Sequence, residues 1–118
     1  MTTQHTFGES DKLDAQSFIA GTRVTVKVSK FLGRFPFKEE HGRQVEDAFY
    51  EVDDKGIIRE YRLGFKAEQT LKIKYHMTRY EDLVGKEITL DVKRYKLGFN
   101  GFVLVDVRDG PGKAQEKV

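Results

Sequence analysis

A period-two alternation of apolar and polar side chains is the feature that most restricts the fold of this chain. Val24, Val26 and Val28 alternate with polar residues, which is typical of a β-strand with one buried face. Glycine, proline and short polar pairs stand between such stretches and favour turns. The pattern predicts five short strands, over residues 22–31, 47–52, 57–65, 88–92 and 102–107.

The connections between these strands differ in kind. Residues 53–56, Asp-Asp-Lys-Gly, predict a tight hairpin. The pair Asn100-Gly101 predicts a turn before the last strand, because both residues tolerate positive φ. Residues 32–46 have no clear period and contain Gly33, Pro36 and Gly42. They predict a long loop, and long loops in compact domains are often functional or mobile.

Residues 67–80 admit two interpretations. Ala67, Leu71 and Tyr75 are spaced by four residues, which predicts a helix. Residues 71–77 also alternate as a strand would. We favour the helix, because the following stretch ends at Gly85, a residue suited to the turn between a helix and a strand.

Five short strands with a helical insert between the third and the fourth predict an all-β protein with the architecture of a five-stranded OB-fold-like barrel. An SH3-like barrel is the main alternative, but it would place its helical turn later. We divide the chain into a flexible N-terminal segment over residues 1–12, a barrel over residues 13–108 and a flexible polar tail over residues 109–118.

Composition restricts the class of protein. The chain has 118 residues, enough for one domain, and a formal net charge of +2, which neither favours nor excludes a nucleic-acid ligand. It contains no cysteine, which excludes disulfides and cysteine-bound zinc. The polar start of the chain is unlike a signal peptide, and no apolar run approaches the ~20 residues of a membrane helix. We expect a cytoplasmic protein that does not associate with membranes.

Patterns for catalysis and metal binding are weak. His5, His41 and His76 lack the spacing of metal ligands. The run from Gly110 to Lys113 lacks the length and the hydroxyl residue of a P-loop. We therefore expect no enzymatic activity, no cofactor and no metal.

Two segments resemble a known group of proteins. One is Asp14-Ala-Gln-Ser-Phe18-Ile, before the first strand, and the other is Glu81-Asp-Leu-Val-Gly85-Lys-Glu-Ile-Thr-Leu90-Asp-Val92, with a polar helix between them. Together they are similar to small OB-like proteins of phages and archaeal mobile elements, over residues 14–107. The resemblance implies an OB-like architecture and a bias toward nucleic acid, with DNA slightly preferred over RNA.

Basic and aromatic residues are interleaved in the connections after the first and fourth strands, the loops that an OB-fold places against its ligand. Cations contact phosphates, and aromatic rings stack on bases at ~1–3 kcal/mol each. The face of the second and third strands would extend this surface. For each phenylalanine, packing in the core is the alternative. The candidate binding residues are Lys30, Phe31, Arg34, Phe35, Phe37, Lys38, Phe49, Arg62, Arg94, Tyr95, Lys96 and Phe99.

Acidic residues gather on and around the second strand. Glu46, Asp47, Glu51, Asp53 and Asp54 would repel phosphate if they faced a nucleic-acid ligand. We expect them instead at a solvated hairpin tip, away from the binding surface.

These observations lead to a noncatalytic OB-fold protein that binds single-stranded DNA or RNA. A homodimer or a replication protein is a possible further partner. The alternative is a protein-interaction or assembly module of a mobile element or virus, which would dimerise through exposed aromatic residues, because such residues serve protein interfaces equally well.

Overall fold

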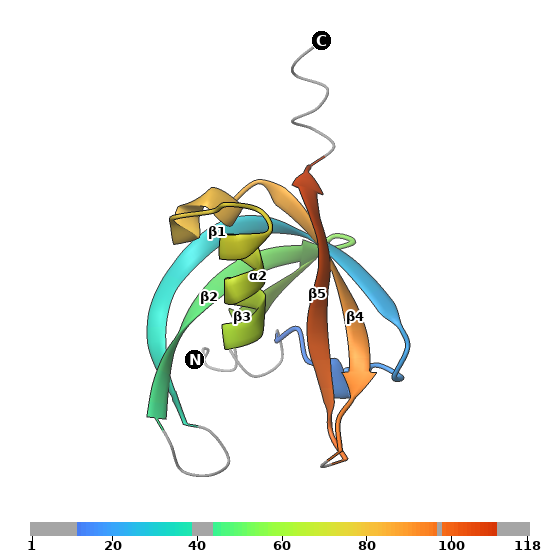
Figure 1. The fold of residues 1–118 in the computed structure, drawn as a ribbon. Coiled ribbons are helices and arrows are strands. Elements are labelled where there is room, and N and C mark those ends of the chain that lie inside the picture. Colours follow the sequence, from blue (N-terminus) through green and yellow to red (C-terminus); the bar gives the residue numbers. More distant parts are fainter. Residues whose placement is uncertain (1–11, 39–43, 97, 111–118) are drawn as a thin grey trace, which may run out of the picture.

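The computed structural model describes residues 12–38, 44–96 and 98–110. Five strands form one open antiparallel sheet in the order β3-β2-β1-β4-β5, accompanied by one short α-helix. Figure 1 shows the sheet bent like an arch, with β2 and β3 on one side, β4 and β5 on the other, and α2 at the opening between them. The elements are η1 (Ala15–Ser17), β1 (Arg23–Lys38), β2 (Gln44–Asp54), β3 (Ile57–Leu63), α2 (Phe65–Ile73), η2 (Tyr80–Leu83), β4 (Lys86–Arg94) and β5 (Asn100–Asp109), where η denotes a 3₁₀ turn.

Strand β1 joins the two sides of the arch because it pairs with two partners. Residues 23–27 pair with β4, and residues 27–38 pair with β2. Two register shifts, between Val28 and Lys30 and between Phe31 and Gly33, mark bulges of the kind that bend a strand. Gly33 has φ +125°, a conformation that residues with a Cβ rarely adopt.

The long loop predicted over residues 32–46 is wrong for the described residues. Residues 32–38 belong to β1, and residues 44–46 belong to β2. Each bulge changes which face of the strand the next residue occupies, so the period-two signal disappears from the sequence although the strand continues. Residues 39–43 lie outside the described part of the chain.

Each of the other four predicted strands overlaps an observed strand, and two differences have a clear cause. The third predicted strand extends to Phe65, but Phe65 begins α2 and its side chain is 74% exposed. In β5, a register shift opposite Thr89 and Leu90 changes the inward face. Phe102 therefore packs against the core before the shift, and Val107 does so after it.

The hydrophobic core lies on the inner face of the arch. It takes alternate residues from every strand, Leu71 from α2 and Leu83 from η2. Burial of these side chains is the main favourable term in folding. The buried core residues of the strands are Val24, Val26, Val28, Ala48, Tyr50, Val52, Tyr61, Leu63, Ile88, Leu90, Val92 and Leu104.

The helical insert predicted over residues 67–80 is confirmed only for its first part, since α2 ends at Ile73. His76 has a left-handed φ of +57°, and the N–H of Met77 donates to the carbonyl of Leu71 at 3.0 Å. The backbone therefore turns back on the end of the helix, and the strand alternative for residues 71–77 is wrong. In the described residues, no helix is long and apolar enough to cross a membrane.

The edge strands β3 and β5 approach each other across the opening of the arch. The rings of Tyr61 on β3 and Phe102 on β5 have centroids 6.4 Å apart. The chain before β1 also reaches β3: Lys12 forms a parallel bridge with Glu60, and the Leu13 N–H donates to the Glu60 carbonyl at 2.8 Å. Side chains and the preceding segment thus connect the two edges.

We expect the Gly33→Ala substitution to destabilise the fold by about 1–3 kcal/mol, the usual range for a strained backbone conformation. A Cβ at this position would also lie 3.3 Å from the Phe35 ring. Gly64→Ala is the matched control, because Gly64 has φ −78° and open space around its Cβ position. Urea unfolding of both variants measures the difference. Equal stabilities would contradict a conformational requirement for glycine at position 33.

We expect stability to fall as the pH rises above about 10, where exposed tyrosines ionise. Burial raises the pKa of Tyr61 and of Tyr50, since a buried site disfavours the charged phenolate. A raised folded-state pKa contributes stability that is complete below the unfolded-state pKa and is lost at higher pH. Denaturant unfolding at several alkaline pH values should show a smaller loss for Tyr61→Phe than for the wild type. An identical loss in both proteins would refute this role of Tyr61.

Candidate functional site

Residues 93–99 end β4 and lead to β5, and three of the first four are cations, Lys93, Arg94 and Lys96. We call residues 93–99 the basic hairpin. The Tyr95 N–H donates to the Phe99 carbonyl, and the Gly98 N–H donates to the Tyr95 carbonyl, both at 2.9 Å. The turn predicted at Asn100-Gly101 is therefore wrong, because both residues belong to β5. The left-handed conformation of the turn is instead supplied by Gly98, which precedes Asn100 and has φ +86°.

Two aromatic rings are stacked on the basic hairpin. The Tyr95 and Phe99 rings have centroids 5.4 Å apart and planes inclined by 22°. The Tyr95 ring lies against Gly101, where a Cβ would come within 2.6 Å of it. Val92 is buried on the inner face of the sheet, so its neighbour Lys93 lies on the outer face. Gly101 pairs with Lys93, and the Tyr95 ring therefore covers the outer face of the sheet. Phe99 remains 40% exposed, so part of this apolar side chain is accessible to a ligand.

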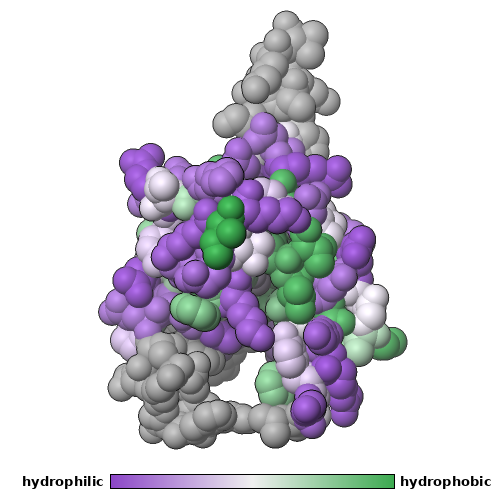
Figure 2. All heavy atoms as spheres, in the orientation of Figure 1, coloured by the Kyte–Doolittle hydropathy of each residue, from purple (hydrophilic) through white to green (hydrophobic). Residues whose placement is uncertain are grey.

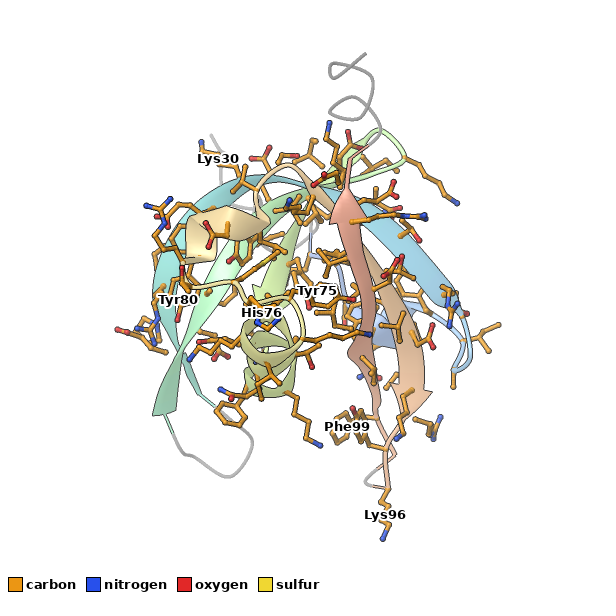
Figure 3. The ribbon with its side chains drawn as sticks, turned by 45° about the horizontal axis from the view of Figure 1, so that its top comes forward. Lys30, Tyr75, His76, Tyr80, Lys96 and Phe99 are labelled. Carbon is orange, nitrogen blue, oxygen red and sulfur yellow. The ribbon has the colours of Figure 1, made fainter. Side chains whose placement is uncertain are left out.

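Three cations, Lys93, Arg94 and Lys96, lie on the same hairpin as these rings. The Lys93 Nζ lies 5.8 Å from the centroid of the Tyr95 ring, within the range of a cation–π contact. Arg94 and Lys96 are exposed, and Figure 3 shows Lys96 at the far end of the basic hairpin, beyond Phe99. Within the described ranges, none of the three cations forms an ion pair with a carboxylate. Their charge is therefore available to an anionic ligand.

A second aromatic pair lies on β1 and β2. The Phe35 and Phe49 rings meet edge to face, with centroids 5.8 Å apart, and Phe35 is 48% exposed. Phe49 points away from the face of Ala48 and Tyr50, which are buried. Two further candidates, Phe37 and Lys38, belong to β1, but their side chains lie outside the described part of the structure.

The cations near this second pair are largely neutralised. Arg34 forms an ion pair with Glu46 at 3.5 Å, and Arg62 forms one with Asp47 at 2.6 Å. The expectation that Glu46 and Asp47 lie at a hairpin tip, away from the candidate residues, is wrong. Both stand on β2 directly beside the candidates, because the strand begins at Gln44 and carries them into the sheet.

The candidate Phe31 packs inside an aromatic cluster and does not join the exposed aromatic pairs. Its ring packs 5.2 Å from Tyr50 and 5.4 Å from Tyr80, between centroids, and the contact with Tyr80 is stacked. Register shifts in β1 turn Phe31 to the same face as Tyr50. The Arg34 guanidinium lies 5.7 Å from the Tyr80 ring, and burial raises the pKa of Tyr80. This cluster joins β1 to η2, so packing explains Phe31.

The two aromatic pairs do not form one continuous surface. Figure 1 shows the paired ends of β1 and β2 and the paired ends of β4 and β5 at the same end of the molecule, on opposite sides of the arch. Among the described side chains, no ring contact joins one pair to the other. Lys30 is exposed, but Figure 3 shows it at the end of the molecule opposite Phe99 and Lys96. Of the predicted residues, the structure brings together Arg94, Tyr95, Lys96 and Phe99.

Sequence reasoning missed two residues that matter to this site, Lys93 in the basic hairpin and Gly101 in β5. Lys93 was not among the candidates, although its position two residues before Tyr95 places both side chains on one face of an extended strand. Gly101 was taken as a turn residue, whereas it leaves room for the Tyr95 ring. Within the described residues, no cluster of three or more histidine, aspartate or glutamate side chains could hold a metal ion.

No protein-family model matches the sequence, and no curated protein matches it.

We expect Gly101→Ala to displace the Tyr95 ring from β5 with little effect on the stability of the fold. The new methyl group would meet the far edge of a side chain rather than backbone, and alanine costs less entropy in a strand than glycine. Ring-current shifts of the Tyr95 and Phe99 protons in NMR spectra measure the displacement, with Gly64→Ala as the control. Unchanged shifts would show that the ring does not need glycine beneath it.

Proposed function

We propose that this chain is an OB-fold-like protein that binds single-stranded nucleic acid without catalysis, and that the basic hairpin makes the principal contact. The strand order β3-β2-β1-β4-β5, with a helix between β3 and β4, is compatible with the five-stranded, partly open OB barrel. The approach of Tyr61 to Phe102 supports closure between β3 and β5 through side chains.

The observation that carries the proposal is the combination, on one short hairpin, of a partly exposed aromatic ring with three cations that form no ion pair with a described carboxylate. Lys93, Arg94 and Lys96 would contact phosphates, and Phe99, backed by Tyr95, would stack on a base. A ring that is already held by a second ring loses little freedom when a base covers it. Stacking of this kind is worth ~1–3 kcal/mol per base and tolerates any base.

Single strands are favoured over duplexes because a base must be unpaired and splayed out to present its flat face to a ring. DNA is slightly preferred over RNA on the resemblance alone.

In OB-folds that bind oligonucleotides, the face of strands two and three usually takes part as well. Here that face carries Asp47, Glu51 and Glu60 beside Phe35 and Phe49. Carboxylates repel phosphate, so we assign this surface a secondary role, limited to stacking by Phe35. Much of the face drawn in Figure 2 is hydrophilic. The basic hairpin is distinguished by three neighbouring cations that form no ion pair with a described carboxylate.

We expect the triple substitution Lys93→Gln, Arg94→Gln and Lys96→Gln to weaken oligonucleotide binding and reduce its salt dependence. Each phosphate contact on a single strand contributes about 0.7 to the slope of log affinity against log salt concentration. Loss of three contacts should therefore reduce the slope by about 2. Fluorescence anisotropy with a labelled oligonucleotide, titrated at several salt concentrations, measures both quantities.

The matched control removes the same charge elsewhere, through Lys27→Gln, Lys55→Gln and Lys74→Gln. These lysines are exposed and lie outside the basic hairpin. Their loss should leave the slope close to that of the wild type. Equal losses in both triple variants would show that only net charge matters, and absence of binding by the wild type at low salt would overturn the proposed function.

A second candidate function is a protein-interaction or assembly module. Phe65 and Ile73 on α2 are 74% and 72% exposed. A pocket of about 180 Å³, lined in part by Leu71, Met77 and Leu83, lies between α2 and η2. Its size suits one side chain of a partner rather than a cofactor. Light scattering distinguishes the two functions, because a stable oligomer without affinity for oligonucleotides would favour assembly.

A further inference from the structure

The segment before β1 contacts the base of the basic hairpin through Gln16. The Gln16 Nε2 donates to the Asn100 carbonyl at 2.6 Å, and the Asn100 N–H donates to the Gln16 Oε1 at 3.2 Å. One carboxamide thus satisfies both backbone groups of the first residue of β5. A peptide unit of a neighbouring strand would make the same pair of bonds.

Asn100 is also fixed through its own side chain. The Asn100 Nδ2 donates to the Phe18 carbonyl at 2.8 Å. Its Oδ1 is buried and has no hydrogen-bond partner among the described residues, although unpaired buried acceptors are uncommon. The Phe18 ring packs 6.1 Å from Phe102, between centroids. Asn100 is therefore held by three hydrogen bonds to Gln16 and Phe18, which precede β1.

That segment is itself firmly anchored. Leu13 and Ala15 are buried, and the Leu13 N–H bonds to the Glu60 carbonyl of β3. The Gln16 N–H donates to the Asp14 Oδ1 at 3.0 Å, which caps η1 and holds the backbone of Gln16. Residues 12–18, which we call the strap, therefore reach from the edge of β3 to the edge of β5 and can transmit rigidity to the latter.

We propose that Gln16 is a positioning residue that holds the basic hairpin in place. Its importance for binding rests on the function proposed above for that hairpin. Asn100 directly follows Phe99, and Gly101 supports the Tyr95 ring. Bonds that fix Asn100 thereby fix the two residues that determine where the stacked rings lie. Without Gln16, the first residue of β5 would lose its outer partner, and the basic hairpin would sample other positions relative to the sheet.

Gln16→Met tests this role because methionine keeps the length of the side chain and removes both hydrogen bonds. Gln16→Ala removes the side chain as well. Ser17→Ala is the matched control, since Ser17 lies beside Gln16, is exposed, and forms no side-chain hydrogen bond within the described residues. Amide hydrogen exchange of the free protein, followed by NMR, is the first readout.

We expect exchange at Asn100, Tyr95 and Gly98 to become faster in both Gln16 variants, by roughly two- to tenfold for each of the two hydrogen bonds lost. Tyr95 and Gly98 are decisive because their N–H groups bond within the hairpin and not to Gln16. Exchange at Val26 and Leu90 in the core should stay unchanged. Acceleration confined to Asn100, or equal acceleration in the core, would overturn the positioning role.

Oligonucleotide binding supplies the second readout. The Gln16 variants should bind several-fold more weakly with an unchanged salt slope, because all three cations of the hairpin remain. A reduced slope, or an affinity equal to that of the wild type, would overturn the proposal. If the wild type binds no oligonucleotide, the proposed function fails, while hydrogen exchange in the free protein still decides whether Gln16 holds the basic hairpin in place.

Discussion

The bend in β1 is the constraint on which the rest of the structure depends. A single strand pairs with β4 through its first residues and with β2 through the remainder, so both sides of the arch exist only if β1 turns between them. Two bulges and the left-handed φ of Gly33 make that turn possible. The inward valines of β1 then meet core residues from both sides. The backbone conformation of β1 at these bulges thus helps to bring both sides of the arch onto a common hydrophobic core.

Charge pairing separates the two aromatic surfaces more clearly than ring exposure does. Phe35 and Phe99 are similarly exposed, but ion pairs with Glu46 and Asp47 neutralise the arginines near Phe35. Surface ion pairs contribute little to stability, yet they decide how much field a surface presents to an anion. The cations of the basic hairpin are not neutralised in this way, because no described carboxylate lies within ion-pair distance of them.

The sequence was informative wherever local pattern and tertiary contact agree. Val24, Val26 and Val28, and likewise Ile88, Leu90 and Val92, alternate regularly and are buried as predicted. The pattern failed at the bulges of β1 and β5, where an irregular register changes the face of each later residue. Contacts between residues distant in sequence could not be predicted either. The packing of Phe31 against Tyr80 and the hydrogen bonds between Gln16 and Asn100 leave no local pattern in the sequence.

The separation of Gln16 from Asn100 has a consequence for how the protein is made. The two residues stand 84 positions apart, so a ribosome adding about 5–20 residues per second completes the partner roughly 4–17 s after the strap. Until β5 has been synthesised, Leu13 and the edge of β3 lack this neighbouring strand. Contacts over such a span close slowly. The seam between the edge strands therefore cannot close until β5 has been synthesised, and until then the edge of β3 lacks its neighbour across the arch.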